Sequence, residues 1–62
     1  MLVALYQNFI HNFFLRITKS KVEGSDIFVY VLEKGYEEGP SPTVLDVSPN
    51  LIAIKKLMKE YL

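Results

Sequence analysis

Apolar side chains recur at spacings of three and four along the first part of the chain. These positions are Leu2, Val3, Leu5, Tyr6, Phe9, Ile10, Phe13, Phe14 and Ile17. The polar residues Gln7, Asn8, His11 and Asn12 fall together on the opposite side of a helical projection. Because this periodicity is typical of an amphipathic helix, we expect a helix over residues 2 to 14.

The segment after that helix also fits an extended chain, because alternate residues from 13 to 18 would lie on opposite faces of a strand. We expect a strand over residues 15 to 22, and the point at which helix changes to strand stays open. Gly, Ser and Asp between residues 22 and 26 predict a turn.

The middle of the chain predicts two more strands. Residues 27 to 32 are six consecutive β-branched, aromatic or aliphatic residues, which is typical of a central strand that is apolar on both faces. Two Gly and two Pro within residues 35 to 42 predict an exposed loop. The short apolar run over residues 43 to 47 follows a proline, so an edge strand is expected there.

The C-terminal segment predicts a second helix. Ser48 provides an N-cap hydroxyl, and Pro49 suits the first helical position because its missing N–H would be unpaired there anyway. The predicted apolar side of this helix comprises Leu51, Ile54, Leu57, Met58, Tyr61 and Leu62. Its polar side carries Lys55, Lys56, Lys59 and Glu60.

Together these elements predict one small two-layer α+β domain over residues 1 to 62. It would have an N-terminal helix, a two- or three-stranded antiparallel sheet and a C-terminal helix. The alternative is a mainly helical hairpin with only a two-stranded ribbon.

Size and composition favour association with another molecule. A domain of about 60 residues buries only about 60% of the surface of its unfolded chain, so it often needs extra support. This chain has no cysteine and one histidine, which argues against disulfides and against a structural zinc site. Seven basic and seven acidic side chains give zero net charge, which also favours association.

No pattern in the sequence predicts catalysis, a metal or a cofactor. His11 is the only histidine, and no serine is placed with it as a nucleophile would be. Glu37 and Glu38 are adjacent loop acids whose side chains would diverge, and they match no calcium-loop spacing. The three glycines form no phosphate-binding motif. We therefore expect a protein that is not an enzyme.

The apolar side of the first predicted helix is wider than a small sheet would cover. Exposed apolar patches of this kind mark interaction sites, so we expect a cytoplasmic adaptor or small subunit that self-associates, most simply as a homodimer. The expected interface is Leu2, Leu5, Tyr6, Phe9, Ile10, Phe13, Phe14 and Ile17. The alternative is that these side chains only fill the core of a monomer.

Two further surfaces are candidates for partners. Tyr36, Glu37 and Glu38 form a loop that a second protein could contact. Two basic clusters favour nucleic-acid binding as an alternative function. They are Arg16, Lys19 and Lys21 in one and Lys55, Lys56 and Lys59 in the other. Membrane binding is not expected, because the polar side of the first predicted helix lacks the lysines and arginines of interfacial helices.

Overall fold

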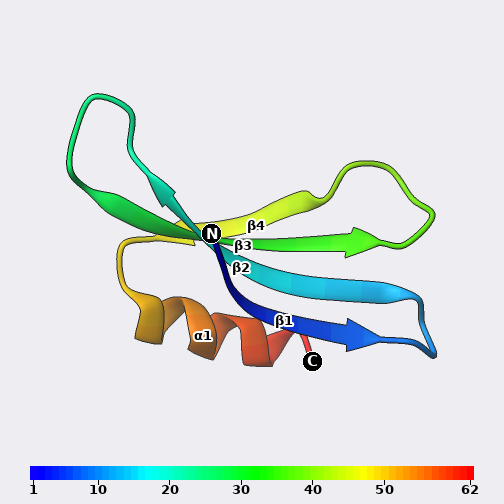
Figure 1. Cartoon of the computed structure of the whole chain (residues 1–62). Helices are drawn as coiled ribbons and strands as arrows, with labels where there is room; N and C mark the ends of the chain where they lie inside the picture. Colours follow the sequence, from blue (N-terminus) through cyan, green and yellow to red (C-terminus); the bar gives the residue numbers. More distant parts are fainter.

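The computed structural model describes all 62 residues. Four antiparallel strands are followed by one helix (Figure 1). Their bounds are β1 (Leu2–Asn8), β2 (Phe13–Lys21), β3 (Phe28–Tyr36), β4 (Thr43–Ser48) and α1 (Leu51–Glu60). The sheet order is β1-β2-β3-β4, so each strand pairs with its neighbour in the sequence. The predicted N-terminal helix is wrong, and so are the two- or three-stranded sheet and the alternative helical hairpin.

The segment expected to be a helix is a β-hairpin. β1 and β2 pair antiparallel from Leu2 opposite Thr18 to Asn8 opposite Phe13. At the turn, the Oδ1 of Asn8 accepts hydrogen bonds from the backbone N–H groups of Ile10 and His11 at 3.1 and 3.0 Å. Asn12 has a φ of 56°, in the left-handed region that asparagine tolerates better than most residues. Of the polar residues that resembled one side of a helix, Asn8, His11 and Asn12 therefore build the turn, whereas Gln7 lies in β1.

The central hairpin agrees with the sequence over most of its length. β2 and β3 pair from Phe13 opposite Tyr36 to Lys21 opposite Phe28. The predicted turn is confirmed: Gly24 has a φ of 81°, and the N–H of Val22 donates to the carbonyl of Ile27 at 2.8 Å. β3 continues through Tyr36, so the exposed loop that was expected from residue 35 begins two residues later.

β4 is an edge strand, as predicted, and it contains a bulge. The register places Asp46 opposite Leu32 and Val44 opposite Glu33, which leaves Leu45 as the extra residue. A bulge turns a side chain away from regular alternation, and Leu45 packs against the buried core.

α1 is the predicted C-terminal helix, but its start lies two residues later than expected. Asn50 is the N-cap, and its Oδ1 accepts from the N–H of Ala53 at 3.1 Å. Ser48, the expected cap, instead accepts from the N–H of Asn50 through its Oγ. The Oγ of Ser48 and the Oδ1 of Asn50 thus each accept from an N–H that would otherwise lack a partner at the helix start.

The core lies between α1 and one face of the sheet. Its buried side chains are Leu15, Ile17, Leu32, Ile54 and Met58. A helix of ten residues is only about 15 Å long, whereas a nine-residue strand is about 30 Å long. One such helix covers part of one face, and no element lies over the other face (Figure 1). We call that uncovered side the open face.

Candidate functional site

The open face is defined by register, because residues directly opposite one another in a sheet point to the same side. Leu15, Ile17 and Leu32 point toward α1, so their neighbours along each strand point away from it. The open face consists of Leu2, Leu5 and Gln7 on β1, Phe14, Arg16, Thr18 and Ser20 on β2, Val29, Val31, Glu33 and Gly35 on β3, and Val44 and Val47 on β4. Most of these side chains are apolar, which is unusual for a sheet face left to water.

The outer strands carry the most exposed apolar side chains of this face. Leu2 and Leu5 on β1 and Val44 and Val47 on β4 are each about half exposed. Between them, Thr18, Val29 and Val31 are partly buried by their neighbours. The apolar surface therefore extends from one edge of the sheet to the other.

One ion pair lies among these apolar residues. Nε of Arg16 donates to Oε1 of Glu33 at 3.0 Å, with side-chain exposures of 37% and 17%. Arg16 also has its Cζ 5.6 Å from the centre of the Phe14 ring, a cation–π contact. Neither Nη group of Arg16 has a hydrogen-bond partner within the chain. The guanidinium is thus held in place while most of its N–H donors remain available.

The predicted interface residues do not share one surface. Leu2, Leu5 and Phe14 lie on the open face, whereas Tyr6, Phe13 and Ile17 point to the α1 side, where Ile17 is completely buried. Phe9 and Ile10 lie at the tip of the β1–β2 turn, 73% and 88% exposed. The helix that was expected to unite them does not exist, and the open face contains three of the eight.

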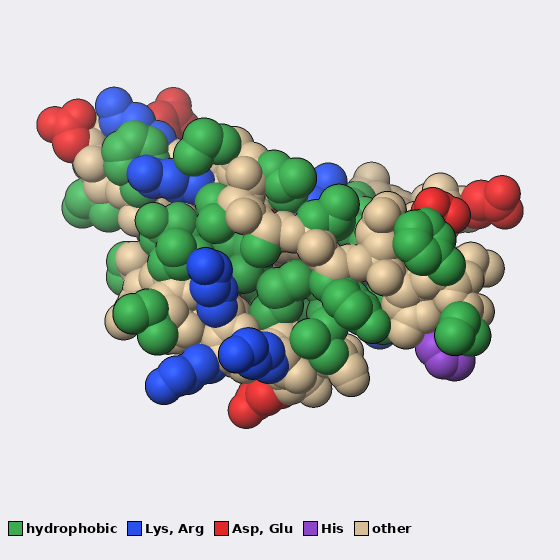
Figure 2. All heavy atoms as spheres, turned by 60° about the horizontal axis from the view of Figure 1, so that its bottom comes forward, with side chains coloured by type: hydrophobic (Ala, Val, Ile, Leu, Met, Phe, Trp, Pro, Cys, Tyr) green, Lys and Arg blue, Asp and Glu red, His purple; other side chains and the backbone are tan.

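The predicted basic clusters are also divided by strand alternation. Arg16 is on the open face, whereas Lys19 and Lys21 are on the α1 side, where Nζ of Lys19 lies 4.5 Å from the centre of the Phe28 ring. Lys55, Lys56 and Lys59 are exposed on α1, and Figure 2 shows lysines gathered along that helix. Arg16 therefore faces away from all of these lysines.

The loop expected to contact a partner lies beside the β1–β2 turn. Tyr36 ends β3, and Glu37, Glu38 and Gly39 together with Tyr36 and Asn12 line a shallow pocket of about 270 Å³. Lys34 extends over Tyr36, with Nζ 5.7 Å from the ring centre. The loop is exposed, as predicted, and its contact with a partner stays a prediction.

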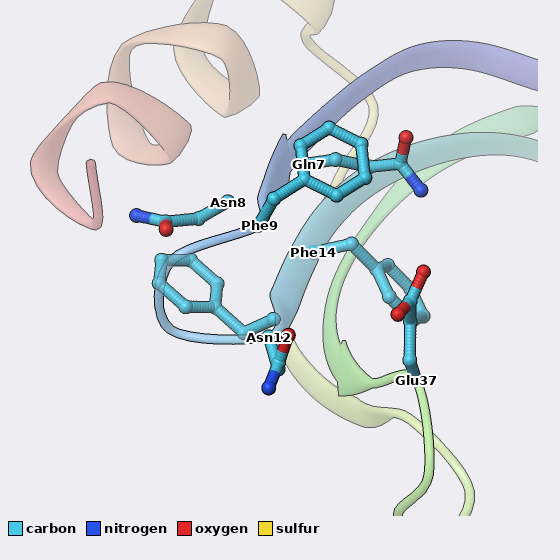
Figure 3. Close-up of a pocket in the computed structure, with 7 residues that line it drawn as sticks. Gln7, Asn8, Phe9, Asn12, Phe14 and Glu37 are labelled. Atoms are coloured by element: carbon cyan, nitrogen blue, oxygen red, sulfur yellow. The ribbon is translucent and has the colours of Figure 1, made fainter.

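A second pocket lies at the same end of the sheet (Figure 3). Its lining includes Gln7, Asn8, Asn12, Phe14 and Glu37, and its volume is about 10 Å³. That volume is about enough for a single water molecule.

The titratable residues form no cluster with obvious chemistry. His11 lies exposed at the β1–β2 turn, and Figure 1 shows this turn at the opposite end of the molecule from the β2–β3 loop. Its only hydrogen bond in the structure is made by its backbone N–H to Asn8. No three His, Asp or Glu side chains are grouped so that they could hold a metal ion. The open face is therefore the strongest candidate site.

Sequence reasoning missed the part of this site contributed by β3 and β4. Val31, Glu33, Val44 and Val47 lie far from Leu2 and Leu5 in the sequence and share a face with them only through the sheet register. A usable signal was present in residues 27 to 32, which are apolar on both faces of a strand, whereas a two-layer domain covers only one face of its sheet.

Comparison with known proteins adds no family to this description. No protein-family model matches the chain, and neither a curated protein nor a solved structure matches it. The helix of the structure is not long and apolar enough to cross a lipid bilayer.

Proposed function

We propose that this chain is a non-catalytic protein-interaction module that self-associates through the open face of its sheet. The observation that carries the proposal is an apolar sheet face that extends across all four strands and has no covering element. Large exposed apolar patches mark interaction sites, and sheets with one solvated face normally alternate apolar and polar side chains. This face does not.

The size of the open face suits a dimer. The molecule measures 39 × 23 × 15 Å, and the sheet extends along its two longer dimensions. A stable interface buries about 800 Å² per partner, and a face with this outline has room for it. Zero net charge removes the long-range repulsion between two copies.

Nucleic-acid binding, the alternative function, has less support. One of its two clusters needs Arg16 beside Lys19 and Lys21, but Arg16 is paired with Glu33 on the opposite side of the sheet. A cytoplasmic location agrees with the absence of cysteine and stays a prediction.

Mass measurement with two matched variants tests the proposal. Sedimentation equilibrium of the wild type should show a concentration-dependent change from 7.2 kDa to twice that mass. Leu5→Asp, at a position 51% exposed on the open face, should weaken association at least about tenfold. Ile52→Asp is the matched control, because isoleucine is an isomer of leucine and this position is 70% exposed on α1, on the other side of the molecule. It should leave association unchanged.

A wild type that stays at 7.2 kDa at all concentrations would overturn the proposal. Equal weakening by both variants would overturn the assignment to the open face. Circular dichroism of each variant separates lost association from lost folding.

A further inference from the structure

Two rows of side chains cross the open face at right angles to the strands. The register places Leu5 beside Arg16, Arg16 beside Glu33 and Glu33 beside Val44, so these four form one row across all four strands. The second row is Leu2, Thr18, Val31 and Val47 in the same strand order. Both rows have an apolar residue at each end, and the first has one positive and one negative charge at its middle.

The first row is complementary to itself under one particular symmetry. Consider two copies stacked with their open faces together, related by a two-fold axis that runs parallel to the strands between β2 and β3. This axis lays β2 of each copy over β3 of the other, and β1 over β4. Because Arg16 and Glu33 are directly opposite in the register, each Arg16 then lies over Glu33 of the second copy, and each Leu5 lies over Val44.

Other stacking arrangements lack this complementarity. A two-fold axis at right angles to the strands, running along the same row between the two copies, would lay β2 over β2 and Arg16 over Arg16. Like charges placed together at an interface disfavour association. The axis along the strands is therefore favoured by the charges at the centre of the face.

The hydrogen-bonding state of Arg16 supports the same arrangement. Within the chain only its Nε has a partner, the Oε1 of Glu33. Both Nη groups remain available for a second carboxylate, and guanidinium–carboxylate hydrogen bonds are among the stronger ones. A facing copy supplies such a carboxylate at the centre of an otherwise apolar contact.

From these observations we infer that the partner of the open face is a second copy of this chain, stacked around a two-fold axis parallel to the strands, with a four-membered charge cluster of two Arg16 and two Glu33 side chains at its centre. The inference rests on the proposed function, since it specifies the partner and geometry of that same surface. Leu5 and Val44 would flank this cluster at its two ends, and the second row would lie along one side of it.

A double charge exchange tests the geometry without removing the ion pair inside each chain. The variant Arg16→Glu/Glu33→Arg should fold and form homodimers like the wild type, because the new carboxylate at position 16 would lie over the new guanidinium at position 33 of the second copy. Mixed with the wild type, it should form heterodimers at least about tenfold less often than random mixing, since like charges would face one another. Native mass spectrometry of the mixture, with one chain isotope-labelled, measures the three dimer populations.

The single variants supply the converse test. Arg16→Glu alone and Glu33→Arg alone should each dimerise poorly, because four like charges would meet, whereas an equal mixture of the two should form heterodimers. Circular dichroism checks that each single variant is folded, and the double exchange remains decisive if one is not.

The outcomes separate the geometry from the proposed function. A dimeric wild type that prefers heterodimers with the double exchange would overturn this axis in favour of Arg16 over Arg16 while self-association stands. Random mixing would remove Arg16 and Glu33 from the interface, and it would overturn the inference alone. A wild type that is monomeric at all concentrations would overturn both proposals.

Discussion

The two faces of the sheet have similar side chains but different surroundings. On the α1 side, Leu15, Ile17 and Leu32 are fully buried under Ile54 and Met58. On the open face, leucine and valine of comparable size are about half exposed at the outer strands. The difference teaches that apolar character alone does not decide which face of this sheet is covered, because the chain has a single helix. Side chains of the same kind therefore stabilise the fold on one face and are available for binding on the other.

The largest expected effect on stability is that of truncating a buried leucine, compared with the same truncation on the open face. Leu15→Ala removes a fully buried side chain beneath α1 and should lower the free energy of unfolding by about 2–5 kcal/mol. Leu5→Ala makes the same change on the open face and should cost less than about 1 kcal/mol in dilute solution. Urea denaturation at concentrations where the chain is monomeric measures both. Equal costs would mean that the open face is as important to the monomer as the core.

A second comparison, between exposed positions on the two sides of the molecule, should become visible when the protein is concentrated. Association stabilises the folded state by mass action, so Leu5→Ala should lose more of the concentration-dependent gain in stability than Ile52→Ala on α1. The midpoint of urea unfolding, followed over about a hundredfold range of concentration, detects this difference.

The contrast between the faces also explains why the sequence misled at its beginning. A strand is recognised by alternation of apolar and polar residues, but β1 carries apolar residues toward both α1 and the open face. Because apolar and polar residues do not alternate in β1, the spacing of three and four between apolar residues was the only regular pattern in this segment. Asn8 and Asn12, which form the turn through a side-chain hydrogen bond and a positive φ, fell on the polar side of the helical projection.

Local signals were sufficient where the chain has strong turn and cap residues. Gly24 and Ser25 indicated the β2–β3 turn, and Ser48 and Pro49 indicated the start of α1 to within two residues. The site needed information of another kind. Arg16 and Glu33 are separated by 17 residues, and their pairing depends on the register of two strands, which no local pattern determines.

Gly35 offers a smaller test, confined to the open face. It lies opposite Phe14, and a Cβ built on it would be 2.5 Å from Cζ of the Phe14 ring. Alanine in a strand interior normally gains about 0.5–1 kcal/mol over glycine, but displacing a packed ring costs about 1–3 kcal/mol. Because the obstacle is the far end of a side chain on an uncovered face, we expect Gly35→Ala to cost a net value of about 1 kcal/mol.

A double-mutant cycle checks that reason. In a Phe14→Ala background the ring is absent, so Gly35→Ala should become neutral or stabilising, by up to about 1 kcal/mol. The sign of the Gly35 substitution would then depend on Phe14. If Gly35→Ala is equally destabilising in both backgrounds, the cause lies in the backbone of β3 and the ring is not involved.

An effect of similar size is expected at the helix that distinguishes the two faces. Asn50→Ala removes the side-chain oxygen that caps the N–H of Ala53 and should cost about 1 kcal/mol, whereas Asn50→Asp keeps a capping oxygen and places a negative charge at the positive end of α1. If the sheet depends on α1 for its stability, the substitution should also destabilise the strands against which α1 packs. Amide hydrogen exchange should then accelerate in β2 and β3 as well as in α1, by about fivefold for this change in free energy. Faster exchange in α1 alone would show that the four strands stay folded when α1 is unfolded. The stability of the sheet would then not depend on the helix that packs on its covered face.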